Sequence, residues 1–117
     1  MGKAVLDQFS SVSLIVRSIY LLPMAEGEPL FELGAIVATP GALRLMLTNG
    51  VQPQDLLKRH VTGDWSEMDV EDQTTNHEAI KHGARIFSAY RVSPSTRIWV
   101  ITESDRSATT FLRPEDY

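Results

Sequence analysis

The end of the chain carries the pattern that most constrains the fold. Residues 84–92 and 97–103 alternate apolar and polar side chains, a period of two that predicts β-strands. The loop 93–96 between them predicts a β-hairpin. After a turn at 105–107, residues 108–112 predict another strand. Because short turns join these strands, we expect a C-terminal three-stranded antiparallel meander.

Helix signals occupy the middle of the chain. Thr39 is a suitable N-cap, and Pro40 suits the first helical position because its missing N–H is not needed there. Acidic residues begin the last of these signals and basic residues end it, which complements the helix dipole. The predicted helices begin at Pro40, near Pro53 and near Asp69, and they end at Leu47, Val61 and His82.

Two apolar segments precede the helices. Residues 10–22 predict a strand, although a short buried helix fits the same pattern. Residues 31–38 predict another strand, in which Gly34 marks a bulge or a close approach of the backbone. Strands, then helices, then strands favour an α+β fold, with about three helices packed on one face of an antiparallel sheet. The 117 residues are enough for one core, so we expect a single domain, 1–117.

Composition excludes several classes of protein. The chain has no Cys, which excludes a disulfide framework, a zinc finger and a thiol nucleophile, and which fits the reducing cytoplasm. The net charge of −4 disfavours nonspecific coating of nucleic acid. The apolar run 12–24 contains Arg17 and Pro23 and is too short to span a bilayer. We therefore expect a cytoplasmic protein without a membrane contact.

The first candidate site lies at the end of the second predicted helix. His60 can act as a general acid or base, because its ordinary pKa lies near neutrality. Asp64 can orient it, Trp65 can stack on a ring or a base, and Arg59 adds a cation. The alternative interpretation is that His60 shares the apolar face of its helix as a hydrogen-bonded core residue, with Trp65 buried behind the turn.

The second candidate site follows the strand 97–103. Thr102 and Thr110 can donate hydrogen bonds, Glu103 can act as a base, and Arg106 can clamp a phosphate or a carboxylate. The alternative is a structural turn in which Arg106 pairs with Glu103 or with Asp64.

The sequence predicts no metal site and no cofactor. His77 and His82 are five positions apart, which places them on different helix faces. There is no HExxH motif and no phosphate-binding glycine loop. The acidic run 64–72 can imitate a phosphate backbone, or it can simply be a solvated helix N-terminus.

Three segments carry a resemblance to a known group of proteins. They are LGAIVATPGAL (33–43), RH followed by GDW (59–65), and WVITE followed by DRS and TT (99–110). On these motifs, about three quarters of the chain resembles an uncharacterised family of small proteins from bacterial plasmids, prophages and other mobile elements. Ser66 stands where the family pattern has Gly, and Arg113 where it has an apolar residue. The resemblance implies an accessory role on a mobile element and names no reaction.

Members of that family sometimes carry a type I restriction-modification label. This chain is far too small for a methyltransferase subunit and shows no cofactor loop, so we discount the label. The layout also resembles ribonuclease domains of the barnase and colicin type. There, a helix-borne histidine and sheet-borne Arg and Ser/Thr gather around a phosphate. The corresponding residues here are His60, Arg85, Ser88, Thr102 and Thr110.

These observations leave three hypotheses about function. The one we favour is a small binding or inhibitory module that engages a host or defence protein. The second is a metal-independent ribonuclease that uses His60, although acidity makes nucleic acid a less favoured partner. The third is an oligomerising domain whose N-terminal strand pairs across a homodimer. The sequence does not decide whether the chain is an enzyme.

Overall fold

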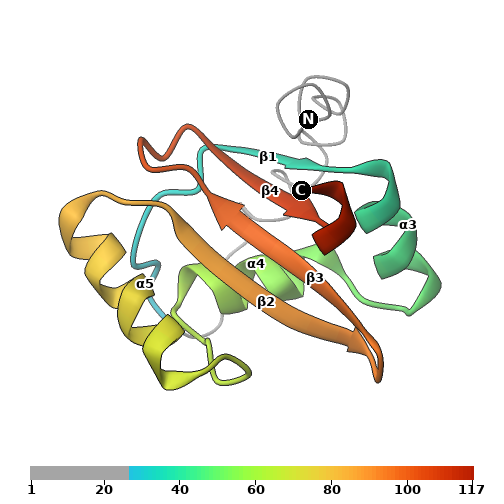
Figure 1. The fold of residues 1–117 in the computed structure, drawn as a ribbon. Helices are drawn as coiled ribbons and strands as arrows, with labels where there is room; N and C mark the ends of the chain where they lie inside the picture. Colours follow the sequence, from blue (N-terminus) through green and yellow to red (C-terminus); the bar gives the residue numbers. More distant parts are fainter. Residues whose placement is uncertain (1–26) are drawn as a thin grey trace.

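The computed structural model describes residues 27–117. The strand expected within 10–22, and the dimer contact assigned to it, lie outside these residues. In residues 27–117 the elements follow the order strand, helices, strands (Figure 1). They are β1 (Ala35–Ala38), α3 (Pro40–Thr48), α4 (Pro53–Val61), α5 (Val70–His82), β2 (Ile86–Ser93), β3 (Thr96–Thr102), β4 (Ala108–Leu112) and the 3-10 helix η1 (Pro114–Asp116).

The strands form one mixed sheet in the order β1-β4-β3-β2. The pairs β2–β3 and β3–β4 are antiparallel, as the short turns between them require. The expectation of a wholly antiparallel sheet is wrong, because β1 pairs with β4 in parallel. The long connection between β1 and β4 contains all the described α-helices and the hairpin, so it returns the chain to the end of the sheet at which β1 starts.

Local signals place the helix ends. The Thr39 hydroxyl accepts a hydrogen bond from the Ala42 amide at 3.1 Å, and Pro40 follows at the first helical position. Helix α5 ends at Gly83, whose φ of 68° is the left-handed conformation that glycine adopts readily. None of the described helices has the length and apolarity needed to cross a membrane.

Strand β1 is shorter than predicted because of Gly34. Its φ is +66°, and a Cβ at this position would lie 2.4 Å from the Arg106 backbone oxygen. The chain therefore bends at Gly34, against the turn that precedes β4, and pairing begins at Ala35, whose amide donates to the Ser107 oxygen at 3.0 Å. The close approach expected at this glycine is confirmed.

Helices α3, α4 and α5 lie on one face of the sheet, which we call the helix face (Figure 1). The apolar residues of the strands that point to this face pack against the helices. In the main core these strand residues pack against Ala42 and Met46 of α3 and against Leu57 and Val61 of α4. The opposite face, the outer face, has no α-helix of the described residues over it, although the short 3-10 helix η1 lies against β3 there (Figure 1). Period-two alternation places Phe87, Ala89 and Arg91 of β2 and Arg97, Trp99 and Ile101 of β3 on this outer face.

Side chains cover part of the free edge of β2. The Asn76 amide of α5 donates to the Phe87 oxygen at 2.7 Å and accepts from the Phe87 amide at 3.1 Å. The Glu67 carboxylate accepts from the Arg91 amide at 2.8 Å. These side chains occupy positions that the backbone of a further strand would use, which protects the edge against pairing with another chain.

Candidate functional site

A buried hydrogen-bonded chain connects α4 to the sheet. The His60 Nδ1 lies 2.5 Å from the Ser88 hydroxyl, and its Nε2 lies 2.8 Å from the Thr102 hydroxyl. The Thr102 and Thr109 hydroxyls are 2.7 Å apart, and Thr109 donates to the Leu33 oxygen at 2.7 Å. All four side chains have no solvent exposure. We call these side chains, with the Leu33 carbonyl, the histidine network.

The Leu33 carbonyl, at the end of the histidine network, determines the direction of each hydrogen bond in it. The Leu33 carbonyl can only accept, so Thr109 uses its hydrogen there and accepts from Thr102. Thr102 in turn accepts from the His60 Nε2–H, which leaves Nδ1 to accept from Ser88. Burial lowers the pKa of His60 to about 3, so the imidazole is neutral at pH 7 and matches this arrangement.

His60 therefore has the geometry of a core residue. Both ring nitrogens are engaged, and no ring atom is exposed to a substrate. Trp65 is also buried, with 1% of its surface exposed, and its ring meets that of His77 edge-to-face at 5.0 Å. Residues 59–65 thus place His60 and Trp65 inside the fold, which agrees with the alternative interpretation of this segment as part of the core.

The remaining polar residues of that motif form a surface ion-pair cluster. The Arg59 guanidinium donates to Asp64 and to Glu67, each at 2.8 Å, and lies over the Tyr90 ring at 4.4 Å. The hydrogen bond from Arg59 lowers the pKa of the Asp64 carboxyl below its ordinary value. Asp64 is thus paired with Arg59, and the histidine network does not include it.

Arg106 serves the backbone. Its guanidinium donates to the Ala84 oxygen at 2.6 Å, to the Glu103 oxygen at 3.0 Å and to the Ala79 oxygen at 3.1 Å. These bonds join the end of α5 to the turn before β4, where Arg106 itself has a φ of 60°. With these donors on carbonyls, Arg106 acts as a structural clamp on the chain.

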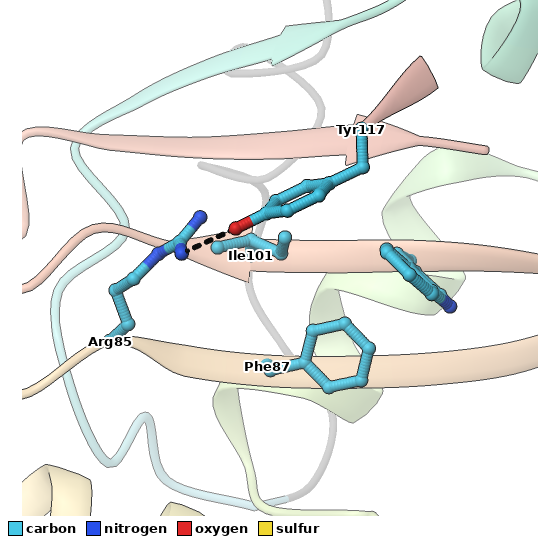
Figure 2. A pocket seen from close by; sticks show the side chains of 5 residues that line it. Arg85, Phe87, Ile101 and Tyr117 are labelled. Carbon is cyan, nitrogen blue, oxygen red and sulfur yellow. Dashed lines mark hydrogen bonds between the residues drawn. The ribbon is translucent and has the colours of Figure 1, made fainter. Parts of the chain in front are cut away.

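The outer face contains a cavity of about 270 Å³ that is lined by Arg85, Phe87, Trp99, Ile101 and Tyr117 (Figure 2). The Trp99 ring meets those of Phe87 and Tyr117 edge-to-face, at 5.0 and 5.8 Å. Arg85 donates to the Tyr117 hydroxyl at 2.9 Å, and the Glu103 carboxylate lies 3.7 Å from its Nε. The cavity thus combines an apolar, aromatic wall with a cation that has 47% of its side chain exposed.

The predicted site residues therefore do not converge on one cleft. His60 and Thr102 belong to the histidine network, whereas Arg85 and Glu103 lie at the outer cavity. Thr110 lies across from Ile101 on the outer face, 6% exposed, and its hydroxyl has no hydrogen-bond partner among residues 27–117.

The aromatic residues of the cavity were not among the site residues predicted from the sequence. The alternation of β2 and β3 already placed Phe87 on one face with Arg85, and Trp99 on one face with Ile101. What it did not supply was the register that sets Phe87 opposite Ile101 and Ala89 opposite Trp99. Tyr117 reaches the same place because η1 turns the chain back over the sheet (Figures 1 and 2).

Within the described part of the chain, no three His, Asp or Glu side chains gather in a way that could hold a metal ion. Comparisons with models of protein families, with curated proteins and with solved structures find no match.

Proposed function

We propose that this domain is a binding module for a partner protein and that the outer face of its sheet is the contact surface. The observation that carries the proposal is the aromatic cavity at Phe87, Trp99 and Tyr117, on the face that no described α-helix covers. Aromatic residues and arginine are the side chains most enriched in the energetically important parts of protein interfaces.

The placement of the other candidate residues supports binding over catalysis. A general acid or base has to reach the group that it protonates, and His60 has no exposed surface. Arg106, the residue considered for a phosphate, has its donors on backbone carbonyls. The arrangement therefore does not favour the ribonuclease hypothesis.

The resemblance to proteins of plasmids and prophages supports a more specific target. On that basis we propose that the partner is a protein of the host cell or of its defence systems, met in the cytoplasm. A small module that occupies one surface of such a protein can inhibit it without any chemistry of its own.

An affinity capture tests the binding function. The tagged wild-type protein, Trp99→Ala and Arg44→Ala are each incubated with lysate of the host cell, and retained proteins are identified by mass spectrometry. Arg44 is exposed on α3, so its substitution is a control away from the outer face. We expect one specific partner on the wild type and on Arg44→Ala, and its loss on Trp99→Ala.

Two results would contradict the proposal. One is the same set of retained proteins, or none, for the wild type and Trp99→Ala. The other is degradation of purified total RNA by the wild-type protein without added metal, which would return the ribonuclease hypothesis to first place.

A further inference from the structure

Two arginines face each other on the outer side of the hairpin. Arg91 of β2 lies directly opposite Arg97 of β3, and both side chains are exposed. Like charges opposite each other on one face destabilise a sheet. Among the described residues no carboxylate lies within 4.0 Å of either guanidinium, and nearby Glu67 is bound by Arg59 and by the Arg91 amide. Arg91 attracts the Glu67 carboxylate over a longer distance, but neither guanidinium of the arginine pair forms a close ion pair with a described carboxylate.

This pair and Arg85 lie on opposite sides of the aromatic cavity. On the outer face, Arg85 comes just before β2, and Phe87, Ala89 and Arg91 follow it along the strand. At about 3.3 Å per residue, Arg85 and Arg91 are roughly 20 Å apart along the strand. A cation therefore stands at each end of an apolar surface, a spacing that an extended segment of about six residues would span.

The size of the cavity restricts what enters it. Sites for drug-sized ligands and cofactors are usually about 300–1,000 Å³, whereas this cavity measures about 270 Å³. One large apolar side chain suits that volume, with its neighbours lying along the strands on either side.

A single-stranded nucleic acid fits the surface less well. Proteins that bind such strands stack successive bases on separate rings along a basic groove. Here the rings of Phe87, Trp99 and Tyr117 pack edge-to-face around one cavity, and the whole chain has a net charge of −4.

We infer that the outer face binds a short acidic peptide segment of the partner protein, with one large apolar side chain in the aromatic cavity and carboxylates on Arg85 at one end and on Arg91 and Arg97 at the other. Arginine suits this role because its planar guanidinium binds a carboxylate through two parallel hydrogen bonds. The inference rests on the proposed function and adds the chemistry of the bound segment.

A peptide selection tests the inference. A random dodecapeptide library displayed on phage is selected on the immobilised wild-type protein, with Trp99→Ala as the counter-selection. We expect enriched peptides to share one Phe, Leu or Trp with acidic residues on both sides of it. Enrichment of basic peptides, or of sequences without an apolar centre, would overturn the inference, as would no enrichment at all.

Charge reversal then tests the arginine pair. The enriched peptide, labelled with fluorescein, is titrated by fluorescence anisotropy against the wild type, Arg97→Glu and Arg44→Glu. Both variants change the net charge equally, but only Arg97 lies on the outer face. We expect binding to weaken about tenfold or more in Arg97→Glu and less than about twofold in Arg44→Glu. Equal weakening in the two variants would overturn the assignment.

Two further outcomes test this inference together with the proposed function, and the first of them separates the two. Loss of the captured partner on Trp99→Ala but not on Arg97→Glu would leave the binding module intact and refute the acidic peptide. Labelled decauridylate that binds the wild type more tightly than the selected peptide, with loss on Trp99→Ala, would identify a single-stranded nucleic acid as the ligand and refute both.

Discussion

The two faces of the sheet are formed by alternate residues of the same strands, yet they treat polar side chains differently. On the helix face, the polar side chains Ser88, Thr102 and Thr109 are buried, and each has a partner in the histidine network. On the outer face, Arg91 and Arg97 lie opposite each other, beside half-buried aromatic rings. The polar groups of the helix face bind one another, whereas the arginine pair of the outer face can bind a ligand.

This difference separates stability from binding along one hairpin. Neighbouring residues such as Tyr90 and Arg91, or Ile98 and Arg97, point to different faces and are subject to different requirements. A substitution in β2 or β3 should therefore affect either unfolding or partner binding, according to the face on which it lies. Measurements of stability and of binding on variants of each face test that separation.

The largest expected effect is the removal of the histidine network. His60→Ala removes the acceptor of the Ser88 hydroxyl and the N–H donor to Thr102, both in a buried position, and opens a cavity. We expect the free energy of unfolding to fall by about 3–5 kcal/mol, against about 1–2 kcal/mol for Phe87→Ala on the outer face. Urea unfolding followed by circular dichroism measures both. Equal losses in the two variants would remove the distinction between the faces.

The second largest effect is expected at the free edge of β2, which borders both faces. Asn76 is 2% exposed and satisfies both backbone groups of Phe87. Asn76→Ala should lower the free energy of unfolding by about 2–3 kcal/mol, because it leaves these groups unpaired. Light scattering should also show self-association, because the edge becomes open to another strand. Thr74→Ala, an exposed position on the same helix, serves as the control and should change neither quantity.

Acid should weaken the helix face through His60. The unfolded chain binds a proton near pH 6.5, whereas the folded chain holds the His60 pKa at about 3. Between these values the unfolded state carries the extra proton, so stability falls as the pH falls. We expect a loss of about 2 kcal/mol between pH 7 and pH 5, a range in which ordinary carboxylates remain mostly ionised.

Unfolding experiments at pH 7, 6 and 5 check this expectation. The loss should disappear in His60→Gln and persist in His82→Gln, because His82 is an exposed histidine at the end of α5. A wild-type protein whose stability is flat over this range would show that the imidazole accepts a proton inside the fold.

The smallest effect has the opposite sign. Arg97→Thr removes the repulsion from Arg91 and places a β-branched residue in a strand, so stability should rise by about 0.2–1 kcal/mol. The same variant should bind the partner more weakly. Thermal unfolding and the anisotropy titration together decide the point. A variant that loses stability would show that the arginine pair supports the fold.

Much of the fold follows from local sequence signals. Thr39-Pro40, Pro53 and Gly83 act within a few residues of themselves, and the helices begin or end where these residues indicate. The meander follows from alternation and short turns. The parallel pairing of β1 with β4 escapes such reasoning, because nothing local in either strand records a partner so distant in the chain.

The candidate sites show the same limit. A histidine between apolar residues fits either a catalytic or a core role, and the choice depends on Ser88 and Thr102, which belong to distant strands. Likewise, Arg106 fits either a clamp for a phosphate or a structural turn residue, and its bonds to Ala79 and Ala84 appear only when distant segments are placed together. To predict the outer cavity one must know the register between β2 and β3 and the position of Tyr117, and no single segment of the sequence contains either.

The position of β4 has a consequence for how the chain folds during synthesis. β4 is the last strand of the described chain, yet it lies between β1 and β3 in the sheet. It also closes the histidine network through a bond between groups that are 76 positions apart. A nascent chain that lacks residues 108–112 would have β1 without its neighbour in the sheet and Thr102 without Thr109, its link to the Leu33 carbonyl. Domains generally fold as units during synthesis. This sheet is complete only once β4 has been made, so a ribosome-stalled chain ending before Ala108 should remain sensitive to proteases.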